Sequence, residues 1–104
     1  MHTVMWTFAL PAGTSKTDVT ETIRATAHNY QNVPGLIRKY YGLTPDGASL
    51  VGIYLWENPV AADTFYTPDG QAAVAKRWAC IPERRDWETP MVVESAQNRL
   101  IAAQ

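Results

Sequence analysis

Two neighbouring stretches of this chain are apolar on both of their faces. Residues 36–44 and 48–57 each have the pattern of a β-strand, and the Pro45-Asp46-Gly47 turn between them predicts a hairpin. A strand that is buried on one side only should alternate apolar with polar residues, but here large apolar or aromatic side chains occupy both sides. We therefore expect helices to cover one face of the hairpin, and a partner subunit, a ligand cavity or both to cover the other.

Strand and helix patterns also precede the hairpin. Alternation of apolar and polar positions predicts a first strand over residues 2–10. A helix is expected to begin near Ser15, which with Asp18 resembles a capping box, and to end at Pro34-Gly35. The helical spacing predicts a buried stripe formed by Val19, Ile23, Ala27 and Tyr30.

A second helical region is expected after the hairpin. Asn58-Pro59 and Thr67-Pro68 each combine a capping side chain with a proline at the first helical position. The pattern therefore predicts a helix over residues 59–66 that restarts with a kink and continues to about residue 79. Its expected inner side chains are Ala62, Phe65, Tyr66, Ala73 and Trp78.

The C-terminal part completes the order of elements. A fourth strand is expected within residues 86–95, with Pro90 at an edge or a bulge, and residues 96–104 are expected to form a short helix or an arm that reaches a partner. The resulting order, β-α-β-β-α-β, is the ferredoxin-like split pattern. Right-handed crossovers would place both helices on one face of a four-stranded antiparallel sheet.

The other face of this sheet would be uncovered. It carries more apolar groups than a face in contact with water usually does, so we expect two copies of the chain to pair through their sheets. The sequence thus predicts one α+β, ferredoxin-like domain over residues 1–104, and we expect it to form a homodimer whose two sheets face each other. An apolar pocket is expected on the sheet face away from the helices.

Composition and charge narrow the range of functions. The chain has 104 residues, 46% of them hydrophobic, and its eleven aromatic residues suit an interface or a ligand pocket as well as an ordinary core. A formal net charge of −1 without a basic stripe argues against nucleic-acid binding. No apolar run reaches the roughly 20 residues that cross a bilayer, and the N-terminus has no basic leader or small-residue cleavage site.

Few residues suit a metal or a cofactor. The single cysteine, Cys80, cannot form an internal disulfide, which favours a cytoplasmic location. Two isolated histidines, His2 and His28, without a close acidic cluster do not predict a metal site. The sequence contains no phosphate-binding loop or nucleophile elbow, and we expect no cofactor.

The register of the hairpin determines which basic residue faces the predicted pocket. If Asp46-Gly47 is a two-residue loop, Lys39 lies opposite Tyr54, and Tyr41 lies opposite Gly52. A lysine in an apolar cavity can orient a phenolate or lower the pKa of a phenol. The alternative is a solvated lysine that protects an edge strand. A three-residue loop would place Arg38 on that side instead.

Residues 33–57 also resemble a known family. Pro34-Gly35-Leu36, Lys39 and Tyr41, and the segment 52–57 (GIYLWE) are similar to YdhR-type monooxygenases, within the dimeric α/β-barrel group of antibiotic-biosynthesis monooxygenases. The resemblance implies oxidation of a small aromatic or polyketide-like phenol by molecular oxygen, without metal or flavin. Other members of the group degrade haem or have no demonstrated activity.

The resemblance extends to candidate site residues. In the oxidising relatives an Asn and a Trp lie four residues apart on the third strand; here Trp56 matches the Trp, and Gly52 occupies the earlier position. We expect Lys39 and Tyr54 to be catalytic. The expected substrate-binding residues are Tyr41, Gly52, Trp56, Met5 and Thr7. A non-oxidative cyclase or isomerase of the same fold, and a non-catalytic small-molecule-binding dimer, are the alternatives.

Overall fold

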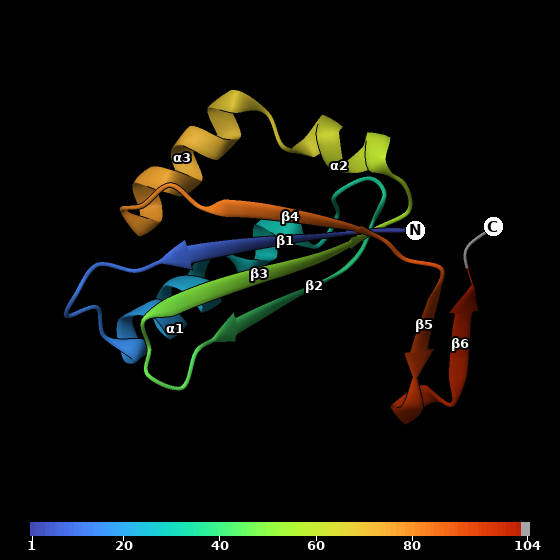
Figure 1. Cartoon of the computed structure of the whole chain (residues 1–104), viewed down its shortest axis with the longest axis horizontal. Helices are drawn as coiled ribbons and strands as arrows, with labels where there is room; N and C mark the ends of the chain where they lie inside the picture. The colour runs from blue at the N-terminus through green and yellow to red at the C-terminus, as the bar shows by residue number, and fades with distance from the viewer. Residues whose placement is uncertain (103–104) are drawn as a thin grey trace.

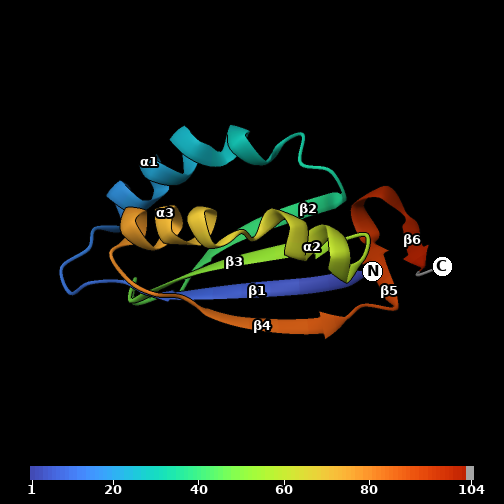
Figure 2. The ribbon, with the colours of Figure 1, turned by 90° about the horizontal axis from the view of Figure 1, so that it is seen from above.

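A four-stranded antiparallel sheet with helices on one face forms the body of the computed structural model, which describes residues 1–102 (Figure 1, Figure 2). The strand order is β2-β3-β1-β4, and the element order confirms the ferredoxin-like βαββαβ prediction. The elements are β1 (His2–Ala9), α1 (Lys16–Thr26), η1 (Ala27–Tyr30), β2 (Leu36–Leu43), β3 (Ser49–Trp56), α2 (Pro59–Phe65), α3 (Pro68–Trp78), β4 (Glu83–Glu88), β5 (Met91–Glu94), η2 (Ser95–Gln97) and β6 (Arg99–Ala102).

Capping side chains start the three α-helices where the sequence predicts. The Ser15 hydroxyl accepts a hydrogen bond from the backbone N–H of Asp18, the Asn58 side chain accepts one from Ala61, and the Thr67 hydroxyl accepts one from Gly70. Each cap of this type stabilises a helix by about 1 kcal/mol. Because Thr67 caps a new helix, the predicted kink is a complete break between α2 and α3.

The β2–β3 hairpin has the predicted register, with Lys39 opposite Tyr54 and Tyr41 opposite Gly52. The loop itself is longer than predicted, because the backbone N–H of Thr44 donates to the carbonyl of Ser49 and leaves residues 45–48 as a four-residue loop. A four-residue loop differs from a two-residue loop by an even number, so the side chains keep the same faces.

A β-bulge changes the start of β2. The register shifts between Leu36, which pairs with Trp56, and Arg38, which pairs with Leu55. At this bulge Leu36 packs against the core, and Ile37 is 37% exposed. The extra residue lets both Leu36 and Lys39 face the helices.

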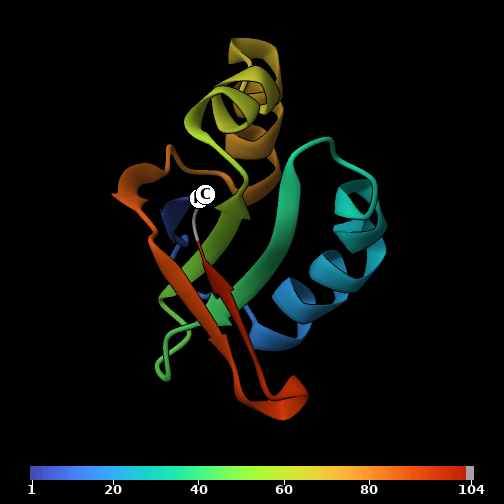
Figure 3. The same ribbon diagram turned by 90° about the vertical axis from the view of Figure 1, so that its right-hand side faces the viewer.

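The fourth strand also differs from its prediction. It begins earlier, at Glu83, and Pro90 separates β4 from a second hairpin formed by β5 and β6. This β5–β6 arm extends from the body on the side opposite to the helices (Figure 3), and Arg38 forms an ion pair with Glu94, at the end of β5 next to the hairpin turn. Residues 96–102 thus belong to this arm as the end of η2 and as β6. Positions 103–104 lie outside the described residues, and contact of the arm with a partner stays a prediction.

Two clusters of buried residues form the core between the sheet and the helices. One contains Val4, Tyr54, Trp56 and Ala62, and the other contains Phe8, Val19, Leu50 and Trp78. Among the expected inner residues of the second helical region, Ala73 is exposed, and Val74 packs against the core instead. No helix within residues 1–102 is both long enough and apolar enough to cross a membrane.

Candidate functional site

Lys39 lies among the rings of three tyrosines beneath the helices. Its Nζ is 3.3 Å from the ring centre of Tyr30, 4.1 Å from that of Tyr41 and 4.6 Å from that of Tyr54. The same Nζ donates a 2.9 Å hydrogen bond to the Tyr41 hydroxyl. We call these three rings the aromatic cage. Tyrosine rings attract a cation through their faces, so the cage favours the protonated form of Lys39.

A small cavity adjoins this lysine, which we call the polar cavity. It has a volume of about 20 Å³, enough for about one water molecule. Residues from β1, the end of α1, η1, β2, β3 and α3 line it: Phe8, Thr26, Tyr30, Lys39, Tyr41, Leu50, Gly52, Tyr54, Val74, Arg77 and Trp78. The Lys39 amine and Arg77 supply its two basic groups, and the described lining residues include no carboxylate.

Burial changes the protonation of the groups in this cavity. Desolvation, together with the positive charge of Arg77, lowers the pKa of Lys39 from 10.5 to about 7. Desolvation is also the main cause that raises the pKa of Tyr41 to about 12, with Tyr30 contributing and Arg77 opposing. Burial raises the pKa of Tyr54 further still. Near neutral pH the site therefore combines a partly neutral amine with protonated phenols.

A larger cavity lies directly beside the first, and we call it the aromatic chamber. Its volume is about 150 Å³, and its lining residues are Trp6, Phe8, Tyr30, Tyr54, Phe65, Gly70, Gln71 and Val74. The two cavities share the side chains of Phe8, Tyr30, Tyr54 and Val74. A cavity of this volume accommodates about one benzene-sized ring. Together they form an aromatic compartment with a polar end at Lys39.

This compartment lies between the sheet and the helices, so the prediction of a pocket on the opposite sheet face is wrong. The side chains that alternate toward the helices, including Lys39 and Tyr54, line the compartment together with Tyr30 of η1 and Val74 of α3. The physical reason is that the aromatic rings packed between the sheet and the helices do not fill all of the space there, and this leaves the two cavities.

The structure brings four of the predicted site residues together. Lys39, Tyr41, Gly52 and Tyr54 all line the polar cavity. A methyl group in place of the Gly52 hydrogen would lie 3.4 Å from the Tyr54 ring and 3.9 Å from Cε of Lys39. Glycine at this position therefore keeps space open beside the lysine.

Three other predicted residues lie elsewhere. Trp56 is fully buried behind Tyr54, with the two rings stacked at 6.0 Å, and lines neither cavity. Its indole N–H donates a 3.1 Å hydrogen bond to the Tyr66 hydroxyl. Met5 and Thr7 were predicted on the pocket face, but alternation along β1 places them on the face opposite to Trp6 and Phe8, which line the chamber.

Several lining residues, among them Tyr30 and Gln71, were not assigned to the site from the sequence. Tyr30 was predicted only as part of a buried helical stripe, yet it contributes to the cage and to both cavities. Gln71 lines the chamber from α3. Arg77 and Trp78 of α3 also line the polar cavity. An aromatic residue in a helical stripe carries no sequence signal that separates core packing from a pocket wall.

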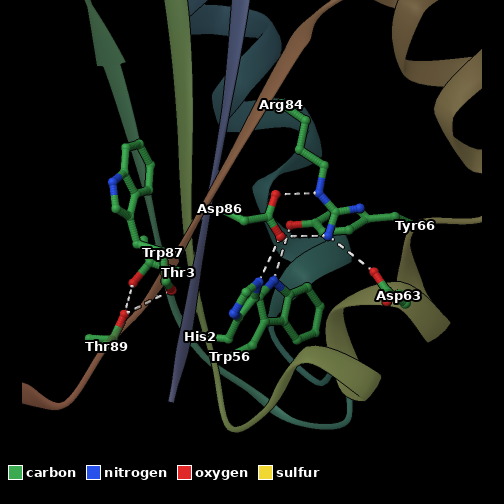
Figure 4. A network of polar contacts seen from close by, with 9 residues as sticks. All are labelled: His2, Thr3, Trp56, Asp63, Tyr66, Arg84, Asp86, Trp87 and Thr89. Atoms are coloured by element: carbon green, nitrogen blue, oxygen red, sulfur yellow. Dashed lines mark hydrogen bonds and ion pairs between the residues drawn. The ribbon is translucent and has the colours of Figure 1, made fainter.

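A network of polar contacts lies at the β4 edge of the sheet (Figure 4). Arg84 donates two hydrogen bonds, of 2.8 and 2.9 Å, to Asp86 and one of 3.1 Å to Asp63. These contacts hold the pKa of Asp86 below its ordinary value. His2 Nε2 lies 2.6 Å from Asp86, and the Arg84 guanidinium lies over the Tyr66 ring at 5.1 Å. Arg84, held in place by Asp86, thus covers part of the aromatic core.

The residues of the compartment do not resemble a metal site. Among residues 1–102, no group of three or more His, Cys, Asp or Glu side chains is placed to hold a metal ion. His2 and His28 lie outside both linings.

Comparison with known proteins identifies the fold. A monooxygenase of Streptomyces coelicolor, solved with nanaomycin D, is similar with a TM-score of 0.68 at 16% identity, over 89% of this chain and 90% of that one. SnoaB, a cofactor-independent oxygenase from Streptomyces nogalater, gives 0.66 at 17% identity, over 88% and 95%. MhuD, solved with two manganese protoporphyrin IX molecules per active site, gives 0.67 at 18% identity, over 90% and 99%.

These similarities define the class of the chain at the level of fold. The fold is that of the antibiotic-biosynthesis monooxygenase-like proteins. At identities below 20% the likeness extends to the fold alone, and the chemistry of the site has to be argued from this chain's own residues. No family model and no curated protein sequence matches the chain.

Proposed function

We propose that this chain is a cofactor-independent monooxygenase that acts on a small aromatic or polyketide-like phenol. The observation that carries the proposal is the position of the Lys39 amine, which lies within the aromatic cage and beside an aromatic chamber. With a pKa of about 7, this amine is available as a base near neutral pH. A base beside an aromatic compartment suits the deprotonation of a bound phenol.

The reaction needs little more than this deprotonation. A phenolate is electron-rich and passes electrons directly to molecular oxygen, whereas the neutral phenol does so poorly. For a substrate whose ring carries a CH₂ group, one oxygen atom replaces the two hydrogens as a carbonyl oxygen, and the other oxygen atom leaves as water. The four electrons removed from the carbon reduce the oxygen molecule, so no further reductant is required.

Each named residue has a role in this scheme. Lys39 accepts the phenolic proton, and Tyr41, which is hydrogen-bonded to Lys39 Nζ at 2.9 Å, orients the amine. Tyr54 keeps its proton because burial raises its pKa, so it can donate a hydrogen bond to the substrate oxygen. Trp56 holds the Tyr54 ring in place through their stacked contact. The aromatic walls exclude water, which strengthens these polar contacts.

The fold gives further support to the proposal, because one protein that shares it is a cofactor-independent oxygenase. The finer assignment to the YdhR-type subgroup rests on the motif at residues 34–57. A cytoplasmic location belongs to the same proposal and rests on the single cysteine.

Homodimer formation is also part of the proposal. Tyr40 and Trp87 lie on the sheet face away from the helices and are 53% and 45% exposed. Val93 and Leu100 form an exposed apolar pair on the β5–β6 arm. A second copy that covers both surfaces would bury apolar area on the order of 2,000 Å². A sedimentation experiment at micromolar concentration should show a dimer, and a stable monomer would reject this part.

Oxygen consumption with a panel of phenols, from one-ring phenols that carry a CH₂ group to three-ring anthrones, in the presence of a metal chelator, tests the proposed reaction. The wild-type protein should consume oxygen, and Lys39→Met should reduce the rate at least about 100-fold, on the scale of general-base catalysis. Lys76→Met is the matched control, because Lys76 lies on the exposed side of α3, outside both cavities. Equal rates for the two variants would exclude Lys39 as the base.

Oxygen-free reactions separate oxidation from the non-oxidative alternative. The same base could abstract a carbon-bound proton in a cyclase or an isomerase. If the substrate is converted at the same rate without oxygen, the protein belongs to that class. If substrates bind without conversion in either condition, the chain is a binding protein.

A further inference from the structure

The charged side chains that line the polar cavity are both basic. Lys39 on β2 and Arg77 on α3 line it from opposite sides, the sheet and the helical layer. Within residues 1–102, neither of these two side chains has an ion pair with a carboxylate. Two positive groups in a partly buried space repel each other, and the lowered pKa of Lys39 reflects part of that repulsion. An anion bound between Lys39 and Arg77 would offset this repulsion.

Arg77 also connects the cavity to the surface. It lines a second, open groove together with Leu10, Asp18 and Trp78. The side chain therefore lies at the boundary between the buried cavity and solvent. Its guanidinium is suited to contact a carboxylate or phenolate oxygen on the way in.

The shape of the compartment limits the size of the ligand. The aromatic chamber, of about 150 Å³, has the volume of one benzene-sized ring, whereas the polar cavity, of about 20 Å³, admits only a small polar substituent. The shared side chains of Phe8, Tyr30, Tyr54 and Val74 make the two spaces neighbours. A ring in the chamber can thus extend an oxygen substituent toward Lys39.

We propose that the compartment selects a single aromatic ring with an acidic oxygen substituent, which it binds as the anion between Lys39 and Arg77. This inference deepens the proposed function. It rests on the proposed function only for the location of the site, because both assign the ligand to the same cavity. It narrows the substrate class from phenols in general to one-ring acids. The ring packs against Tyr30 and Tyr54, and the anionic oxygen compensates the two positive charges.

Binding measurements by titration calorimetry test this inference without any turnover. Benzoate is the charged probe, and benzamide is its neutral analogue of nearly equal shape. Benzoate should bind at least about tenfold more tightly, on the scale of a hydrogen bond to a charged group. Equal affinity for the two probes would overturn the proposal.

Two variants with matched controls locate the anion. Arg77→Gln and Lys39→Met should each weaken benzoate binding about tenfold and leave benzamide binding unchanged. Arg24→Gln and Lys76→Met, which change side chains outside both linings, should bind benzoate as the wild type does. Thermal melts establish that all four variants are folded. Wild-type affinity in Arg77→Gln or in Lys39→Met would reject the proposed position.

Proton uptake gives an independent readout. At about pH 8 the Lys39 amine is mostly neutral, so an arriving anion should draw a proton onto it. The groups that face Lys39 are Tyr30, Tyr41, Tyr54 and Arg77. Titrations in two buffers of different ionisation enthalpy should show uptake of close to one proton in the wild type and none in Lys39→Met. Absence of uptake in the wild type contradicts the inference.

Two further probes test whether a phenolate binds as a carboxylate does, and whether the ligand is limited to a single ring. A phenol that is acidic enough to ionise near neutral pH, such as 4-nitrophenol, reports its own ionisation by its colour and should turn to the phenolate on binding. If only benzoate binds, the site is selective for carboxylates, which contradicts the phenolate part. The two-ring 1-naphthoate should bind at least about tenfold more weakly than benzoate, and equal binding would reject the single-ring limit.

The proposed function and this inference can fail separately. If benzoate binds as expected but no phenol consumes oxygen, the inference stands and the oxygenase proposal fails. If a three-ring anthrone is oxidised while neither one-ring probe binds, the oxygenase proposal stands and the inference is overturned.

Discussion

Replacement of Lys39 by methionine should stabilise the protein, by an amount that depends on pH. The pKa of Lys39 falls from 10.5 to about 7 in the folded protein. Between these pH values the unfolded chain therefore binds one more proton than the folded protein, so the stability of the wild type rises with pH across this window. Below about pH 7 Lys39 is protonated in the folded protein, so the full free-energy cost of burying its charge lowers the stability.

The size of the effect follows from the pKa displacement. Each pH unit corresponds to about 1.4 kcal/mol, so a fully dry site would give about 5 kcal/mol over the whole window. Lys39 is only partly buried, and solvent screening reduces this value. We expect the difference in unfolding free energy between Lys39→Met and the wild type to shrink by about 2–3 kcal/mol from pH 7 to pH 9.5.

Urea denaturation at half-unit pH steps measures this difference directly. Tyr30, Tyr41, Tyr54 and Arg77, which face Lys39, are present in both proteins, so the two proteins differ only in the side chain at position 39. Lys76→Met, on the exposed side of α3, should follow the wild type at every pH. If the difference in unfolding free energy between Lys39→Met and the wild type stays constant within about 0.5 kcal/mol over this pH range, Lys39 keeps its ordinary pKa. The argument for a neutral base would then fail.

Three further substitutions test the packing that supports the site. Gly35→Ala should lower the unfolding free energy by about 2–4 kcal/mol, because Gly35 has φ +79° and an added methyl group would lie 2.5 Å from Cβ of Ala61. Gly13→Ala, also at positive φ but in open space, should cost only about 1 kcal/mol, and equal losses in urea titrations would refute the steric part. Trp56→Phe should cost about 1–2 kcal/mol, because it keeps an aromatic ring but removes the hydrogen bond to Tyr66; an unchanged stability would argue against that bond.

The local signals in the sequence were sufficient for the fold. Capping residues such as Ser15, Asn58 and Thr67 act within a few residues of the chain, so their effect can be predicted without knowledge of the tertiary structure. The hairpin register was predictable for a similar reason, since an error of two residues in loop length does not change the face on which Lys39 lies.

The location of the pocket required information that the sequence does not carry. Side-chain alternation assigned Tyr54 and Trp56 correctly to one face of β3, but it cannot tell whether that face meets the helices or a second subunit. Met5 and Thr7 were assigned to the pocket because alternation alone does not show which face of the sheet carries the pocket. The space beside Lys39 depends on how the rings of Tyr30 and Tyr54 pack, and such packing is a property of the assembled core.

The bulge at the start of β2 has a consequence for sequence comparison across this fold. A chain that lacked Ile37 would pair Leu36 with Trp56 and Arg38 with Leu55 in an uninterrupted ladder, and its lysine would still lie opposite Tyr54. Relatives that carry the same basic residue in the same place can therefore differ by one residue in the spacing between the Pro34-Gly35 corner and that lysine. An ungapped alignment anchored on the corner would match Arg38 to their functional position, whereas an alignment anchored on the hairpin turn would match Lys39. For this strand, homologous positions are better defined by distance from the turn than by distance from the corner.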